Sequence, residues 1–109
     1  MNKILSLFSF GFLSCSVQCG TWVNNVKIEA LYPTTAGLVF IVDAPNLSLS
    51  NCDGGRRYII PMSHPNYDVL SSSLLLAFSM DKDTNINVDD VESPICQPTI
   101  NRIYVKKRR

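Results

Sequence analysis

The stretch YDVLSSSLLLAFSM, residues 67–80, is the one segment whose apolar residues recur with the period of an α-helix. At about 100° per residue, its large apolar side chains share an arc of roughly 200°. That arc holds Leu70, Leu74, Leu76, Ala77, Phe78, Val69 and Met80. Leu75 falls among the serines on the other side, and Asn66 or Asp68 is placed to cap the first turn. The arc is wider than one core contact needs, so the helix either sinks deeply into a small core or also meets a neighbouring subunit.

Three β-strands are predicted before this helix. Residues 22–32 alternate with period two, with Trp22 and Val26 on one expected face. Residues 38–42 are continuously apolar, which is typical of a strand covered on both faces. Residues 43–57 form a loop, and residues 58–60 make a third strand.

Two further strands are predicted after the helix. Residues 81–85 are expected to end the helix, and residues 86–89 alternate as the fourth strand. Residues 100–105 make the fifth. In it Ile103 and Val105 face one way and Arg102 and Tyr104 the other. The fold class is therefore mainly β with one helix, in the order β-β-β-α-β-β.

Five strands with a helix between the third and fourth is the order of the OB-fold, a small Greek-key barrel, in this chain over residues 20–105. The features that match are Trp22, the run Leu74-Leu75-Leu76-Ala77-Phe78, Cys52, Cys96 and the closing strand 100–105. In these the chain resembles small exported bacterial proteins of OB type, from uncharacterised families. It is more distantly similar to the B subunits of AB5 toxins. That second resemblance implies a glycan-binding oligomer, but assigns no sugar-binding residue in this chain.

Residues 1–19 have the shape of a secretory signal peptide. Lys3 supplies the positive start, and an apolar run over residues 4–13 follows. The run is too short to span a membrane, so we expect cleavage near Gly20 and a periplasmic or secreted protein. Lipidation of Cys15, which would anchor the protein to a membrane, is the alternative.

Removal of this segment takes away Cys15 and Cys19 and leaves two cysteines, Cys52 and Cys96. An isolated pair in an oxidising compartment normally forms a bond. A bond that closes the loop between Cys52 and Cys96 stabilises a small domain by about 4 kcal/mol in the chain-entropy model. The alternative is two buried free thiols.

The charge balance argues against nucleic-acid binding. The chain has ten basic and nine acidic residues, so it is close to neutral once Lys3 is removed. Residues 106–109, Lys-Lys-Arg-Arg, form a basic C-terminal tail. Such a tail is either simply solvated or binds an anionic surface.

No catalytic residue, metal site or cofactor is predicted. His64 is the only histidine and no nucleophile motif lies near it, so the chain is not expected to be an enzyme. Residues 81–92 follow the spacing of a calcium loop, with Glu92 at position 12. Ile86 stands at position 6, where the sharp turn requires glycine, which favours a polar turn and a strand.

The candidate ligand-binding residues are Trp22, Arg56, Arg57, Tyr58 and Tyr104. Aromatic rings can stack on sugar rings, and adjacent arginines beside two glycines can hold an anion. The alternatives are core positions for the aromatics and solvated arginines.

The sequence therefore predicts an exported, non-enzymatic binding or assembly module whose ligand is a glycan or a protein. Association into a homo-oligomer is expected through the helix or the strand 38–42. A toxin-B-like glycan-binding subunit and a small secreted enzyme or inhibitor with an unrecognised site remain alternatives.

Overall fold

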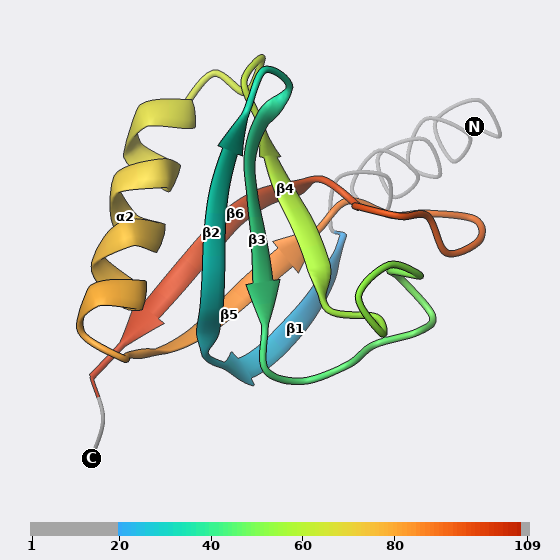
Figure 1. Cartoon of the computed structure of the whole chain (residues 1–109), viewed down its shortest axis with the longest axis horizontal. Helices are drawn as coiled ribbons and strands as arrows, with labels where there is room; N and C mark the ends of the chain where they lie inside the picture. Colours follow the sequence, from blue (N-terminus) through green and yellow to red (C-terminus); the bar gives the residue numbers. More distant parts are fainter. Residues whose placement is uncertain (1–19, 108–109) are drawn as a thin grey trace, which may run out of the picture.

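The computed structural model describes residues 20–107, which form six β-strands and one α-helix (Figure 1). The elements are β1 Thr21–Val26, β2 Ile28–Thr34, β3 Gly37–Val42, β4 Arg57–Pro61, α2 Tyr67–Ser79, β5 Asp83–Val88 and β6 Ile100–Lys106. The strands make two antiparallel three-stranded sheets: β1-β5-β6, which we call sheet A, and β2-β3-β4, which we call sheet B. The chain is mainly β with one helix, as predicted.

The number of strands differs from the prediction because residues 22–32 form two strands. Lys27 separates β1 from β2. Its backbone N–H donates to Asp43 Oδ1 at 3.0 Å, and its carbonyl accepts from the Asp43 N–H at 3.0 Å. Because β1 pairs with β5 and β2 pairs with β3, the two halves of the expected strand belong to different sheets.

The face predicted for Trp22 is also wrong. The register of β1 against β5 shifts between Val23 and Val26, and Asn25 takes a φ of 59°. Such a bulge adds a residue and reverses the alternation. Val23 and Val26 are therefore both buried, whereas Trp22 is exposed.

The turn between β2 and β3 depends on Gly37. This residue has a φ of 149°, and a Cβ there would stand 2.1 Å from the carbonyl oxygen of Ile60 on β4. Thr34 Oγ1 closes the turn, because it donates to the Gly37 carbonyl at 2.9 Å. β3 runs through the middle of sheet B and is buried at nearly every position, as the apolar run 38–42 predicts.

Two backbone features connect the sheets. One is the passage from β1 to β2 through Lys27. The other is a parallel bridge between Ile59 of β4 and Thr99, just before β6. Across the described residues the sheets remain two three-stranded units and no closed barrel is formed.

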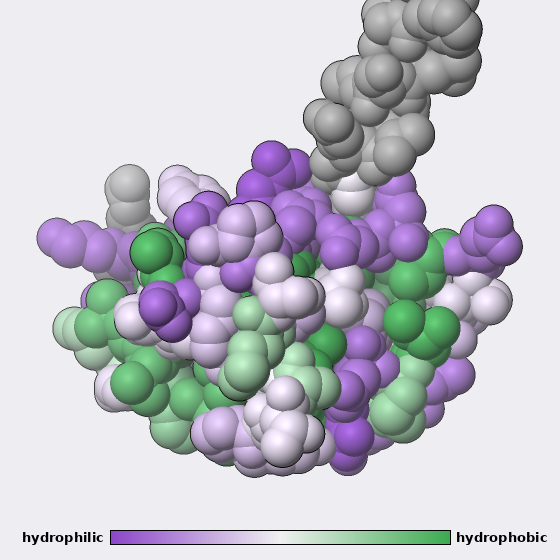
Figure 2. Space-filling model, turned by 90° about the horizontal axis from the view of Figure 1, so that it is seen from above, coloured by the Kyte–Doolittle hydropathy of each residue, from purple (hydrophilic) through white to green (hydrophobic). Residues whose placement is uncertain are grey.

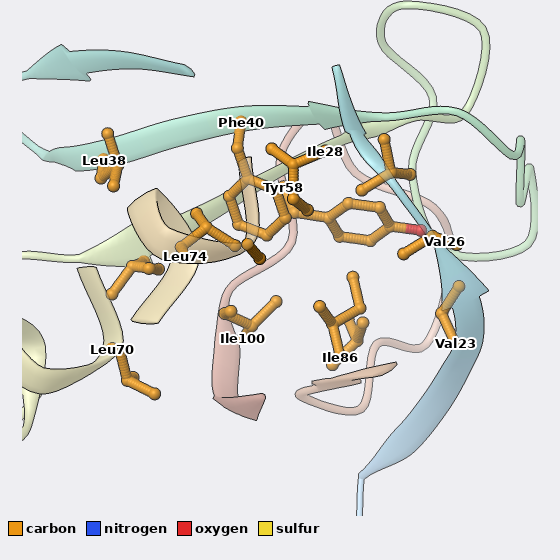
Figure 3. Close-up of a cluster of buried hydrophobic side chains, with 14 of the residues drawn as sticks. Val23, Val26, Ile28, Leu38, Phe40, Tyr58, Leu70, Leu74, Ile86 and Ile100 are labelled. Carbon is orange, nitrogen blue, oxygen red and sulfur yellow. The ribbon is translucent and has the colours of Figure 1, made fainter. Parts of the chain in front are cut away.

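The hydrophobic core lies between the two sheets and α2. Figure 3 shows side chains from β1, β2, β3, β4, β5, β6 and α2 converging there. The largest fully buried side chains are Tyr58, Phe40, Ile60, Leu74, Ile86 and Ile100. The rings of Tyr58 and Phe40 lie 5.9 Å apart, so Tyr58 is a core residue. Its hydroxyl is buried without a hydrogen-bond partner among residues 20–107.

α2 begins at the predicted residue and ends one residue early, at Ser79. It buries only a narrow stripe, Leu70, Leu74 and Ala77. The alternative of a helix sunk deeply in the core is therefore wrong. The Asn66 side chain makes no capping bond. The Asn66 N–H instead donates to His64 Nδ1 at 2.9 Å, so a histidine fixes the entry to the helix.

β5 begins at Asp83, so the segment expected to end the helix is largely strand. β6 extends to Lys106, which places the first residue of the predicted basic tail inside the sheet. Arg102 and Tyr104 are exposed while Ile103 and Val105 pack against the core, as predicted. The signal-peptide prediction with Cys15, and the last two residues of the tail, lie outside the described residues.

Cys52 and Cys96 form a disulfide, as predicted, and their Cα atoms are 4.7 Å apart. The bond joins the loop before β4 to the loop before β6. Backbone hydrogen bonds reinforce it: the Asn51 N–H donates to the Ile95 carbonyl at 2.9 Å, and the Ile95 N–H donates to the Leu49 carbonyl at 3.1 Å. A disulfide is the form expected of these cysteines in an oxidising compartment.

Candidate binding surfaces

The outer face of sheet A gathers two exposed aromatic side chains and an arginine. In the sheet register Trp22 pairs with Asn87 and Asn87 with Arg102, while Asn85 pairs with Tyr104. Directly paired residues, and residues two apart on one strand, share a face. These five residues therefore lie on one side of the sheet, which we call the Trp22 face.

Trp22 and Arg102 reach toward each other across the middle strand. The Arg102 guanidinium lies over the Trp22 ring, 5.5 Å from its centroid. The indole remains 43% exposed and Tyr104 is 57% exposed. A stack of this kind holds a guanidinium in place and is worth about 0.5–1 kcal/mol at an exposed site.

Asn87 lies beneath this stack and is fully buried. Its Oδ1 accepts a hydrogen bond from Asn101 Nδ2 at 2.8 Å. Its Nδ2 has no partner among the described residues. A buried donor left unpaired costs about 1–3 kcal/mol, and polar atoms of this kind call for a structural or functional explanation.

A polar network behind Asn87 connects the sheet to the start of α2. Asn101 Nδ2 also donates to Asp89 Oδ1 at 2.7 Å, and Thr99 Oγ1 donates to Asp89 Oδ2 at 2.5 Å. His64 Nε2 lies 3.1 Å from the Asn101 carbonyl. Since Nδ1 accepts from the Asn66 N–H, Nε2 carries the proton and donates to that carbonyl. His64 thus ties the helix to β6 with both ring nitrogens.

The exposed side of α2 is a second surface. Val69, Leu75, Leu76, Phe78 and Met80 are each 41% exposed or more. Figure 2 shows hydrophobic side chains gathered at the end of the molecule where α2 lies. No residue from Val69 to Met80 carries a charge. A groove of about 420 Å³ runs between α2 and β2, lined by Leu31, Pro33, Leu38, Tyr67, Ser71, Ser72 and Leu75.

The arginines predicted to bind a ligand lie elsewhere. Arg57 Nε donates to Asp53 Oδ2 at 2.6 Å, and its guanidinium lies 5.6 Å from the centre of the Tyr32 ring. Arg56 is 3.8 Å from a carboxylate oxygen of Glu29. Both belong to sheet B and its flanking loop, so they do not join Trp22 and Tyr104.

The five predicted ligand residues therefore fall into three places. Trp22 and Tyr104 share the Trp22 face, Arg56 and Arg57 pair with acids near sheet B, and Tyr58 is in the core. Sequence reasoning missed Arg102 and Asn87. The alternation of β6 already placed Arg102 beside Tyr104, but only the pairing of β1 with β5 brings Trp22 to the same face.

The calcium-like segment is mostly extended, since β5 takes up residues 83–88. Asp81 and Asp83 both lie near Lys27 Nζ, at 3.8 and 3.1 Å. Over residues 20–107, no group of three or more His, Cys, Asp or Glu side chains is gathered as a metal site would require. In the same part of the chain, no helix is both long enough and apolar enough to cross a membrane.

Comparison with protein-family models, with curated proteins and with solved structures finds no match. The resemblance to exported OB-type proteins therefore remains a prediction from the residue pattern.

Proposed function

We propose that this protein is an exported, non-enzymatic binding and assembly module on an OB-like scaffold, and that its copies associate through the exposed face of α2. The observation that carries the proposal is the group of large apolar side chains that α2 leaves exposed, Val69, Leu75, Leu76, Phe78 and Met80, in a segment with no charged residue from Val69 to Met80.

The connections between the sheets support the OB-like scaffold. β1 and β2 run consecutively, one half in each sheet, so that together they act as one long bent strand. β4 and the start of β6 approach in parallel at Ile59 and Thr99. Two sheets joined in this way by a bent strand and a parallel contact, with a helix between the fourth and fifth strands, are compatible with a partly open Greek-key barrel.

The chemistry of α2 supports self-association. In a twofold contact, residues near the axis approach their own copies, so like charges placed there would repel one another. α2 has no charge after Asp68, and the exposed residues that follow are uncharged: Val69, Ser72, Leu75, Leu76, Phe78, Ser79 and Met80. Exposed apolar side chains gathered on one element are typical of an interaction site.

The test is the substitution Leu75→Glu. Leu75 is 53% exposed, so the new carboxylate costs the monomer little but is buried in any contact that uses this face. We expect native mass spectrometry and sedimentation to show an oligomer for the wild type and a monomer for Leu75→Glu, with unchanged circular dichroism.

Leu47→Glu is the matched control, because Leu47 is 64% exposed but lies in the loop between β3 and β4. This variant should remain an oligomer. A wild type that sediments as a monomer at micromolar concentration contradicts the proposal, as does equal dissociation by both variants.

A further inference from the structure

We propose that the Trp22 face of sheet A binds acidic oligosaccharides, meaning chains of sugar rings that bear carboxylates. This inference goes beyond assembly through α2, because it uses a different element and different residues.

Two exposed aromatic side chains on this face provide surfaces for stacking. Trp22 lies on β1 and Tyr104 on β6, the two outer strands of sheet A. Two inter-strand spacings separate these strands, so the aromatic side chains stand on the order of 10 Å apart. Both remain substantially exposed on a sheet face that is otherwise polar. Aromatic faces presented in this way match the apolar faces of consecutive sugar rings.

Two basic side chains flank Tyr104 on β6. Arg102 and Lys106 stand two positions either side of Tyr104, so the strand pattern places both cations on the face of that ring, and Lys106 Nζ also donates to Asn25 Oδ1. A guanidinium binds a carboxylate through two parallel N–H donors. Among the acids in or beside this sheet, Asp89 accepts from Thr99 and Asn101, and an Asp83 carboxylate oxygen lies 3.1 Å from Lys27 Nζ.

Two amide side chains also belong to this face. Asn85 and Asn87 lie between the aromatic side chains, and Asn87 Nδ2 has no partner among residues 20–107. Trp22 and Arg102 meet above Asn87, so a move of Arg102 onto a ligand carboxylate would open this donor to a sugar hydroxyl. Recovery of a buried unpaired donor adds to binding.

Single-stranded nucleic acid is the other ligand that uses aromatic rings with cations. The carbohydrate is favoured because the face carries amides rather than a continuous basic groove, and because the chain has nearly equal numbers of basic and acidic residues. The experiment must therefore distinguish binding of an acidic sugar from binding of a single-stranded nucleic acid.

Trp22 is the only tryptophan of the chain, so intrinsic fluorescence reports on this face directly. The probes are trigalacturonate, its methyl ester and sialyllactose with its neutral parent lactose. We expect saturable changes in Trp22 emission with the acidic sugars. Arg102→Gln should weaken binding of the acidic sugars about tenfold and leave the ester unaffected, because charge-assisted hydrogen bonds are lost. Tyr104→Ala should weaken acid and ester alike, by several-fold.

Tyr32→Ala is the matched control, since Tyr32 is an exposed aromatic residue under an arginine on sheet B. It should bind as the wild type does. The proposal is overturned if neither acidic sugar gives a saturable change, if acid and ester bind equally, or if oligothymidylate binds more tightly through the same residues. Leu75→Glu should retain sugar binding as a monomer, which separates this proposal from assembly.

Discussion

Each sheet carries an aromatic–arginine stack on its outer face, but the residues beneath the two stacks differ. In sheet B, Tyr32 of β2 and Arg57 of β4 meet across the middle strand, with 5.6 Å between the guanidinium and the ring centre. In sheet A, Trp22 of β1 and Arg102 of β6 do the same at 5.5 Å. In each sheet an aromatic residue on one outer strand therefore meets an arginine on the other.

The middle-strand residues beneath the two aromatic–arginine pairs differ in polarity. On sheet B the residue of β3 that pairs with Tyr32 is Val39, which is 1% exposed and apolar. On sheet A the residue of β5 between Trp22 and Arg102 is Asn87, which is fully buried and has an unpaired donor. Arg57 is also bound to Asp53 at 2.6 Å. The pair on sheet B completes a small apolar layer, whereas the pair on sheet A lies over a polar group whose burial costs stability.

The largest expected effect concerns the loops beside sheet B. Cys52→Ser removes the bond that joins the loop bearing Asp53 to the loop before β6. We expect the free energy of unfolding to fall by about 4 kcal/mol, because the unfolded chain gains the freedom of a 44-residue loop. Denaturant titration under non-reducing conditions measures the loss. An unchanged midpoint, or two titratable thiols in the unfolded wild type, would show that the bond does not stabilise the protein.

Exchanging the residue types beneath the two pairs, Val39 in sheet B and Asn87 in sheet A, tests whether the sheets differ in this way. Val39→Asn places an amide under Tyr32 and Arg57 with no partner prepared for it. We expect this variant to lose about 3 kcal/mol of unfolding free energy, since a polar group is buried without a hydrogen bond. Thermal and denaturant unfolding measure this loss.

The reciprocal change, Asn87→Val, should be neutral or stabilise by about 1 kcal/mol, because the unpaired donor disappears and Asn101 Nδ2 keeps its bond to Asp89. It should also weaken binding of acidic sugars. A marked loss of stability in Asn87→Val would mean that Asn87 is a structural residue, and the two sheets would then not differ as described.

The smallest effect concerns Tyr58, whose hydroxyl is another buried polar atom without a partner among residues 20–107. Burial raises the pKa of the Tyr58 hydroxyl, because the charged phenolate is disfavoured in the core. The folded state then holds this proton where the unfolded state has lost it. Stability should therefore fall as the pH rises above about 10.

Tyr58→Phe removes both the unpaired hydroxyl and its titration. Unfolding measured from pH 7 to 11 should show a gain of up to about 1 kcal/mol at neutral pH and a smaller alkaline loss than in the wild type. Identical alkaline profiles would show that other groups dominate. Unlike Asn87→Val, this variant should leave sugar binding unchanged.

The sequence by itself determined the elements that depend on local pattern. The apolar run 38–42 formed the buried central strand, residues 67–79 formed the helix, and the alternation of residues 100–105 gave the faces of Arg102 and Tyr104 correctly. The disulfide also followed from the sequence, because the segment after residue 20 contains two cysteines. Each of these depends on neighbours in the chain or on a simple count.

Tertiary structure decided the candidate sites, because they depend on pairing between distant residues. The bulge at Asn25 turned Trp22 outward, and the N–H of Asn25 is held by Asn85 Oδ1 at 2.8 Å, sixty positions away. Tyr58 became a core residue because β4 packs beside β3. The narrow stripe that α2 buries was fixed by the surface it covers on β2, β4 and β6 rather than by its own wide apolar arc. A period in the sequence shows which residues share a face, but only the pairing of strands shows what that face meets.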